Sequence, residues 1–112
     1  MFYKVIYTNN VIPDKFAGQT IGPFIFIRPE YKSDTGLLEH EKVHVRQFWR
    51  TLGLFGIPYL VSKKYRLKYE LEAYKEQLKY YAEDKKPVFA QHLATKYDLN
   101  ITVEEALKLL SE

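Results

Sequence analysis

His40 and His44 stand four residues apart with Glu41 directly after the first, in the pattern His-Glu-x-x-His. On an α-helix each residue turns by about 100°, so positions i and i+4 lie about 40° apart on one face. Two imidazoles placed in this way can bind one ion, and imidazole nitrogen is a common ligand of zinc. Glu41 lies about 100° round from His40, where its carboxylate can reach a water on the ion without being a ligand itself. The pattern therefore predicts a metal site with Glu41 as general base.

The helix predicted around this pattern gives the two histidines a face of their own. Apolar side chains cluster about 120–180° from His40, which is typical of a core-facing stripe: Leu38, Val45, Trp49 and Leu52. Charged side chains fall at about 200–280°, on a solvated face: Glu39, Lys42, Arg46 and Arg50. Gln47 and Thr51 lie within about 20° of the histidine pair. The histidines therefore face neither the core nor open solvent, which favours a metal site.

A third ligand is expected on a second helix. A catalytic zinc takes three protein ligands and leaves one position for water. The chain has no Cys, and its remaining histidine, His92, is far along the sequence. The second helix, expected from about Ser62 to Asp84, offers Glu70 and Glu72. The members of an apolar stripe fall within about 80° of Glu70, whereas Glu72 lies about 200° round the helix from Glu70, among lysines. Because a buried carboxylate needs a charge partner, we expect Glu70 to be the ligand, with Glu72 as the alternative.

Short strands are expected ahead of the histidine helix. Phe2–Tyr7 and Pro23–Arg28 are rich in β-branched and aromatic residues. The apolar residues of Pro23–Arg28 are consecutive, which predicts a strand covered on both faces. Pro13–Gly22 is interrupted by proline and glycine, so we expect a loop or a broken strand there.

Helix signals fill the rest of the chain. Ser33 or Asp34 is expected to cap the histidine helix, which should end near Leu52-Gly53 and be followed by an apolar connector, 54–61. Pro87 is expected to open a third helix running to about Tyr97. Thr102-x-x-Glu105 is a capping box for a last helix, Val103–Leu110. The predicted fold is α+β, with short N-terminal antiparallel strands followed by a mainly helical core of about four helices, in one domain spanning residues 1–112.

The composition is that of a folded domain. Of the 112 residues 46% are hydrophobic and 16% aromatic, which is ample for a packed core. The absence of cysteine excludes disulfides and thiolate ligands, and with no signal peptide evident it favours a cytoplasmic location. The longest apolar stretch, 52–61, is too short to be a transmembrane segment. The net charge of +3 indicates a solvated basic surface, or a weak attraction to nucleic acid or anionic membrane.

Over residues 22–82 the chain resembles the gluzincin metallopeptidases, and in particular their small bacterial and phage members. In that family one helix carries His-Glu-x-x-His and a later helix carries Glu-x-x-Ala/Ser-Asp, whose glutamate is the third ligand. Here Glu70 and Ala73 match the second motif, and Tyr74 stands where the aspartate is usual. The run from His44 to Gln47 resembles the His-x-x-Gln of the small members. Because the family's aspartate orients a ligating histidine, we expect Gln47 or the Tyr74 hydroxyl to do so here.

The resemblance implies a zinc-dependent metallopeptidase with a zincin-like fold. Zn²⁺ held by His40, His44 and Glu70 would lower the pKa of its water and polarise the scissile carbonyl. Glu41 would take the proton of that water and return it to the leaving amine. The strand around Phe24–Arg28 would hold an extended peptide or protein substrate by edge pairing.

Other functions stay open at this point. Four residues are candidates to stabilise the oxyanion, and the sequence does not choose among them: Tyr59, Tyr65, Tyr69 and His92. If His92 closed the coordination sphere as a fourth ligand, the chain would be a catalytically silent, zinc-stabilised protein-interaction module. A nucleic-acid binder using exposed Tyr and Lys is disfavoured, because no nucleic-acid motif is present.

Overall fold

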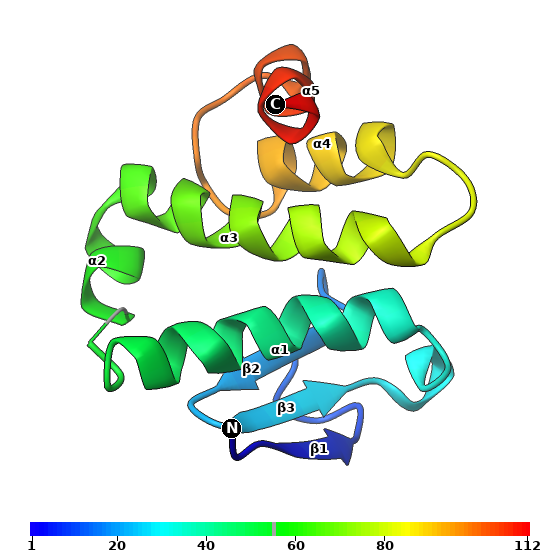
Figure 1. Ribbon diagram of the computed structural model, residues 1–112, viewed down its shortest axis with the longest axis vertical. Coiled ribbons are helices and arrows are strands. Elements are labelled where there is room, and N and C mark those ends of the chain that lie inside the picture. Colours follow the sequence, from blue (N-terminus) through cyan, green and yellow to red (C-terminus); the bar gives the residue numbers. More distant parts are fainter. Residues whose placement is uncertain (55) are drawn as a thin grey trace.

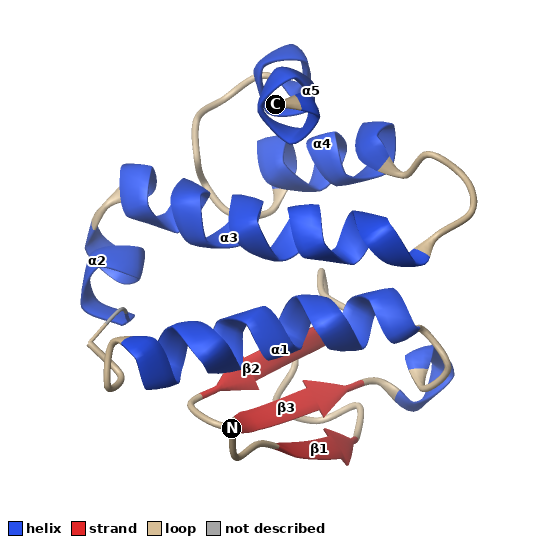
Figure 2. Cartoon of the chain, in the orientation of Figure 1, coloured by secondary structure: helices blue, strands red, loops and turns tan. Residues whose placement is uncertain are grey.

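Three strands and five α-helices make up the computed structural model, which describes residues 1–54 and 56–112. The sheet, α1, α3 and the α4–α5 pair lie in successive layers (Figure 1, Figure 2), and the predicted α+β class is confirmed. The strands are β1 (Lys4–Tyr7), β2 (Gly18–Ile21) and β3 (Phe24–Ile27). The α-helices are α1 (Thr35–Arg50), α2 (Gly56–Val61), α3 (Lys63–Gln77), α4 (Lys86–Thr95) and α5 (Val103–Ser111). Short 3₁₀ turns follow β3 (η1, Pro29–Tyr31) and α3 (η2, Leu78–Tyr80).

β3 is the central strand of the sheet, whose order is β1-β3-β2. β1 pairs with β3 in parallel and β2 pairs with β3 in antiparallel orientation. The sheet is therefore mixed, and the prediction of antiparallel strands is correct only for β2 and β3. β2 lies inside the stretch Pro13–Gly22, where a loop or broken strand was predicted, because pairing with β3 outweighs the weak strand preference of its own residues.

One face of β3 is buried and the other is partly open. Ile25 and Ile27 pack with Leu37 and Val45 of α1 in a buried cluster. Phe24 is 40% exposed, so the prediction that both faces are covered is wrong. The sheet thus presents one apolar face to α1, which fixes how α1 is rotated about its axis.

Asp34 begins α1, as predicted. Its carboxylate accepts a hydrogen bond from the Leu37 N–H at 3.0 Å and another from the Tyr81 hydroxyl at 2.7 Å. A Cβ on Gly36 would lie 2.6 Å from the Tyr81 ring, so the close approach of residue 81 requires glycine here. After α1, Gly53 adopts a left-handed backbone conformation with φ +83°, and its N–H donates to the Phe48 carbonyl at 2.7 Å. This is the glycine cap that was expected at the end of the helix.

The stretch 54–61, predicted as a connector, contains α2; its residue 55 lies outside the described part. Ser62 caps α3 by accepting from the Tyr65 N–H at 3.4 Å. α3 runs alongside α1 (Figure 1). It ends at Gln77, well before the predicted Asp84, because Tyr81 is already extended and turned toward the start of α1.

A second core lies between α3, α4 and α5. Its buried members are Tyr74, Phe89, Ala90, Leu93, Leu99, Ala106 and Leu110. The predicted capping box of α5 is confirmed: Thr102 accepts from the Glu105 N–H at 3.0 Å and Glu105 accepts from the Thr102 N–H at 3.1 Å. Across the described residues, none of the helices has the length and apolar character needed to cross a bilayer.

Candidate metal centre

α1 and α3 bring His40, His44 and Glu70 together at one buried point. The Nε2 atoms of His40 and His44 lie 3.4 and 3.2 Å from Oε1 of Glu70. Ligand atoms about 2.0–2.2 Å from a tetrahedral zinc ion are about 3.3–3.5 Å apart. Two imidazole nitrogens and one carboxylate oxygen at these separations therefore fit the predicted zinc ligand set. Within the described residues this is the single group of at least three His, Cys, Asp or Glu side chains that could hold a metal ion.

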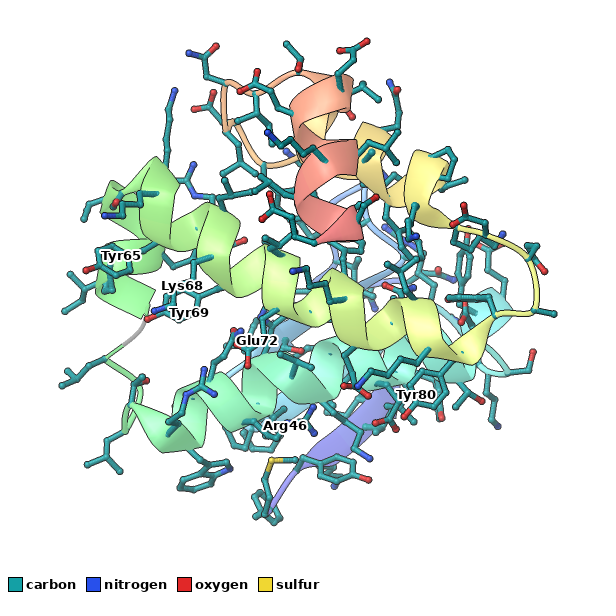
Figure 3. The ribbon with its side chains drawn as sticks, turned by 45° about the horizontal axis from the view of Figure 1, so that its top comes forward. Arg46, Tyr65, Lys68, Tyr69, Glu72 and Tyr80 are labelled. Atoms are coloured by element: carbon teal, nitrogen blue, oxygen red, sulfur yellow. The ribbon has the colours of Figure 1, made fainter. Side chains whose placement is uncertain are left out.

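Glu72 lies outside this group, as the helical wheel predicted. Its side chain is 45% exposed and pairs with the Arg50 guanidinium at 3.1 Å. It lies at the surface where α1 and α3 meet (Figure 3). His92 is also separate: its Nδ1 is 3.4 Å from the Tyr74 hydroxyl, on the α4 side. The described part of the chain therefore offers three ligands with no fourth histidine or acid among them.

The charges of the three groups depend on one another. Burial disfavours the Glu70 carboxylate, but His44 and His40 outweigh burial and hold the pKa of Glu70 well below its usual range. Burial likewise disfavours an imidazolium at His44, and the Glu70 carboxylate outweighs it and raises the pKa of His44 to about 9. A metal ion would take the place of this proton, because a ligating imidazole must be neutral.

Tyr59 of α2 holds the second oxygen of Glu70. Its hydroxyl donates to Oε2 of Glu70 at 2.6 Å. Burial and the Glu70 charge raise the pKa of Tyr59, so that its hydroxyl stays protonated. Oε1 therefore faces the two imidazoles while Oε2 is held by the phenol.

Gln47 orients His44, as its position on the histidine face predicted. Its side-chain amide nitrogen donates to the Tyr69 carbonyl at 3.1 Å and to Oε1 of Glu72 at 2.8 Å. The amide oxygen therefore accepts from Nδ1 of His44 at 2.8 Å. Because Nδ1 of His44 carries the hydrogen, the lone pair of the neutral ring is on Nε2, the atom that faces Glu70.

Tyr74 contacts His40 differently from our prediction. Its ring packs against the His40 imidazole with centroids 4.4 Å apart and the planes at 72°. Its hydroxyl instead lies 2.7 Å from the Tyr97 hydroxyl. Nδ1 of His40 is buried and has no hydrogen-bond partner among the described residues. The phenol thus fixes the His40 ring by packing. Of the two residues expected to orient a ligating histidine through a hydrogen bond, Gln47 does so and Tyr74 does not.

Glu41 is bonded to the strand β2 and is not a member of the ligand cluster, although it lines the same cavity. Its carboxylate accepts a hydrogen bond from the Thr20 hydroxyl at 2.8 Å. The Cβ position of Gly18 lies 3.5 Å from its other oxygen, so a small residue on β2 leaves that oxygen room. Thr20 was not singled out from the sequence, because nothing in residues 13–22 indicates which α1 side chain that strand meets.

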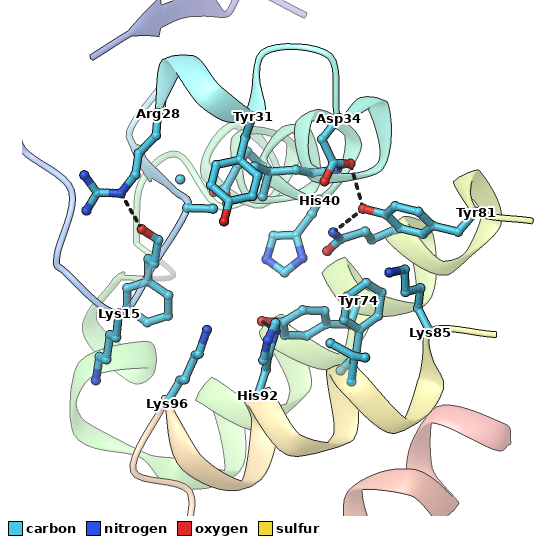
Figure 4. A pocket seen from close by; sticks show the side chains of 18 of the residues that line it. Lys15, Arg28, Tyr31, Asp34, His40, Tyr74, Tyr81, Lys85, His92 and Lys96 are labelled. Atoms are coloured by element: carbon cyan, nitrogen blue, oxygen red, sulfur yellow. Dashed lines mark hydrogen bonds between the residues drawn. The ribbon is translucent and has the colours of Figure 1, made fainter. Parts of the chain in front are cut away.

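Two cavities meet at the centre. A cavity of about 540 Å³ is lined by the three ligands, Glu41, β2 and Tyr59. A second, of about 370 Å³, lies beyond His40, and Figure 4 shows the His40 ring at its middle, with Tyr31, Tyr74 and Lys96 around it. Of the four oxyanion candidates, Tyr59 lines the larger cavity and His92 lines the smaller one. Tyr65 and Tyr69 line neither.

Comparisons with known protein families, with curated proteins and with solved structures find no match to this chain. The interpretation of the centre therefore depends on its own geometry.

Proposed function

We propose that the protein is a zinc-dependent metallopeptidase that hydrolyses peptide bonds, acting in the cytoplasm. The observation that carries the proposal is the convergence of the His40 and His44 Nε2 atoms on one Glu70 oxygen, beside a buried Glu41 that is not part of the cluster. Bound there, zinc would supply a Lewis acid that polarises the scissile carbonyl and acidifies water.

Glu41 is the proposed general base. Its carboxylate lines the same cavity as the three ligands, and the Thr20 hydroxyl holds one of its oxygens at 2.8 Å. It would accept a proton from the attacking water and pass it to the leaving amine as the C–N bond breaks. Among the four oxyanion candidates Tyr59 is the one that lines this cavity, but its single hydroxyl hydrogen is donated to Oε2 of Glu70 at 2.6 Å. Its proposed role is therefore to hold Glu70 in place as a ligand, and it would donate to an oxyanion only after leaving Glu70.

β2 is the proposed substrate-binding strand. β3, which we expected in that role, is bonded to a strand on both sides and has no edge to offer. β2 has its outer edge unpaired within the described sheet, and all four of its residues line the 540 Å³ cavity. An extended peptide that paired with this edge would lie along the ligands.

The test separates metal binding from turnover. Glu41→Gln should keep one zinc per chain and lose hydrolysis of a quenched fluorescent peptide library by at least about 10²-fold, since the general base is lost. Glu70→Ala should lose zinc, while Glu72→Ala, its matched control on another face of α3, should keep both zinc and activity. Turnover that survives in Glu41→Gln would remove Glu41 as the base. Zinc without turnover in the unaltered protein would favour the interaction module.

A further inference from the structure

Residues 42–69 contain no acidic side chain. They hold seven of the 17 Lys and Arg residues and none of the 14 Asp and Glu residues, so the rest of the chain carries a net negative charge. The stretch begins in α1, passes through α2 and ends in α3. The seven basic residues lie on α1 and α3, on either side of the uncharged stretch 51–62 that contains α2.

The same stretch exposes large aliphatic side chains. Five of them are 65 to 80% exposed: Leu52, Leu54, Ile57, Leu60 and Val61. The Arg66 guanidinium anchors the backbone of this segment by donating hydrogen bonds to the carbonyls of Tyr59 at 2.9 Å and Leu60 at 2.8 Å. With α2 anchored through its backbone, its aliphatic side chains are free to face outward.

Further apolar residues gather at this end of the molecule. Trp49 is 43% exposed, and its indole N–H donates to the Phe2 carbonyl at 2.9 Å. Gly22 of the β2–β3 turn and Gly53 both approach the ring of Phe48. Figure 1 shows α2, the end of α1 and the β2–β3 turn on one side of the fold. We call the surface formed by Trp49 and the five aliphatic residues the apolar tip.

Basic residues flank the apolar tip along the chain. Lys63, Lys64 and Lys68 follow it on α3, and Arg46 and Arg50 precede it on α1. Arg50 is paired with Glu72 at 3.1 Å and Lys63 lies 3.9 Å from Asp98, and the described structure gives no ion pair to Arg46, Lys64 or Lys68. Lys68 and Tyr65 lie at the α2 end of α3 (Figure 3). Apolar side chains with a basic rim suit the boundary between acyl chains and anionic headgroups.

We propose that the apolar tip docks the protein onto the surface of an anionic lipid bilayer. The aliphatic side chains would enter the headgroup region while the lysines and arginines contact phosphate and other acidic groups. A second copy of the chain is a poorer occupant, because two such tips would bring like charges together. Nucleic acid is also a poorer occupant, because five of the six side chains of the tip are aliphatic and give its bases no stacking platform.

The docking would place the metal centre at the membrane. Gly53, Gly56, Tyr59 and Leu60 belong to this segment and also line the 540 Å³ cavity. If the proposed function is correct, the substrates are peptide segments presented at the bilayer surface. The docking itself requires neither zinc nor hydrolysis.

Flotation with lipid vesicles tests the docking. The full chain should bind vesicles of phosphatidylcholine with 30% phosphatidylglycerol, bind pure phosphatidylcholine at least ten-fold more weakly, and be released by 0.5 M salt. Ile57→Asp/Val61→Asp, two residues that do not line the cavity, should reduce binding at least ten-fold. Leu107→Asp, an exposed leucine of α5, is the matched control and should bind normally.

A charge-reversal pair tests the basic rim. Lys63→Glu/Lys64→Glu should weaken binding to anionic vesicles about 30-fold or more, at about 1 kcal/mol per lysine near the surface. Lys32→Glu/Lys108→Glu makes the same change in net charge elsewhere and should have little effect. Equal losses in both pairs, or no preference for anionic vesicles, would overturn the proposal. A concentration-dependent dimer abolished by Ile57→Asp/Val61→Asp would instead assign the tip to a second copy. Circular dichroism of each variant verifies folding, and zinc content and peptide hydrolysis are scored separately.

Discussion

At the scale of single residues, Gln47 determines the chemistry of His44. It is fully buried, and its amide bridges the His44 imidazole, the Tyr69 carbonyl and Glu72. Such partners of ligating histidines set the ring orientation and the basicity of the ligand, and their loss typically costs 10–100-fold in metal affinity.

Gln47→Leu should therefore weaken zinc binding by about 10–100-fold, because Nδ1 of His44 loses its acceptor. The affinity is measured by competition with a chromogenic chelator. Gln77→Leu is the matched control, since Gln77 is another buried amide, bonded to Tyr81 and not to the metal cluster. Equal affinities in the Gln47 variant and the unaltered protein would show that Gln47 has no part in the centre.

The raised pKa of His44 predicts a pH dependence of zinc binding. In the metal-free protein this pKa is about 9, so zinc must displace a proton at neutral pH. The affinity for zinc should rise about ten-fold per pH unit from pH 6.5 to 8.5, as expected for one released proton. An ordinary imidazole would give a plateau above pH 7. Calorimetry in buffers of different ionisation enthalpy measures how many protons are released on zinc binding. A zinc affinity that stops rising at pH 7 would contradict the raised pKa of His44.

Stability of the metal-free protein should show the opposite trend. A pKa raised in the folded state contributes stability that is full below the unfolded value of about 6.5 and is lost as the pH rises through 9. The melting temperature of chelator-treated protein should accordingly fall between pH 6.5 and 9. In His44→Gln the melting temperature should fall less over this pH range. If it fell as steeply as in the unaltered protein, another titrating group would be responsible.

Helical periodicity in the sequence is sufficient to separate Glu70 from Glu72 and to place Gln47 beside the histidines. It works because these residues lie on two regular helices whose faces follow from their spacing. Thr20 could not be found in this way, Tyr59 could be named only as one of four oxyanion candidates, and Tyr97 could not be found. They reach the site from a strand, a short helix and the loop after α4, so their positions depend on tertiary packing.

At the scale of elements, the strand β2 links the sheet to the proposed general base, because Thr20 of β2 donates a hydrogen bond to the Glu41 carboxylate. Thr20→Val should lower turnover about ten-fold or more and leave zinc content unchanged, because Glu41 loses a hydrogen bond to a charged acceptor. Thr95→Val on α4 is the matched control, since that hydroxyl bonds only to the Gln91 carbonyl among the described contacts. Unchanged turnover in Thr20→Val would show that β2 does not position the base.

Two elements were not assigned from the sequence: β2, where a loop or a broken strand was expected, and α2, where a connector was expected. β2 contains Gly18 and two polar residues, and α2 contains Gly56 and Pro58, so neither has strong local propensity. Each is held by contacts outside its own residues, β2 by pairing with β3 and α2 by the Arg66 guanidinium. α1 and α5 begin where their predicted caps place them, because caps are local interactions, and α3 begins next to Ser62, where its start was expected.

At the scale of the whole molecule, the centre joins two cores. α1 packs on the sheet with Ile25 and Ile27, whereas α3 packs with α4 and α5 around Tyr74 and Leu93. A metal ion held by His40 and His44 of one unit and Glu70 of the other would tie the two together. Zinc at 100 times its dissociation constant should stabilise the fold by about 2.7 kcal/mol, visible as a rise in melting temperature that Glu70→Ala abolishes and Glu72→Ala retains.

The most direct measurement is anomalous scattering at the zinc edge from a crystal of the zinc-loaded protein. We predict one peak within about 2.0–2.2 Å of the Nε2 atoms of His40 and His44 and of a Glu70 oxygen, with an open side toward the cavity lined by Glu41. A peak at Glu72 or His92, or no peak between α1 and α3, would contradict the account.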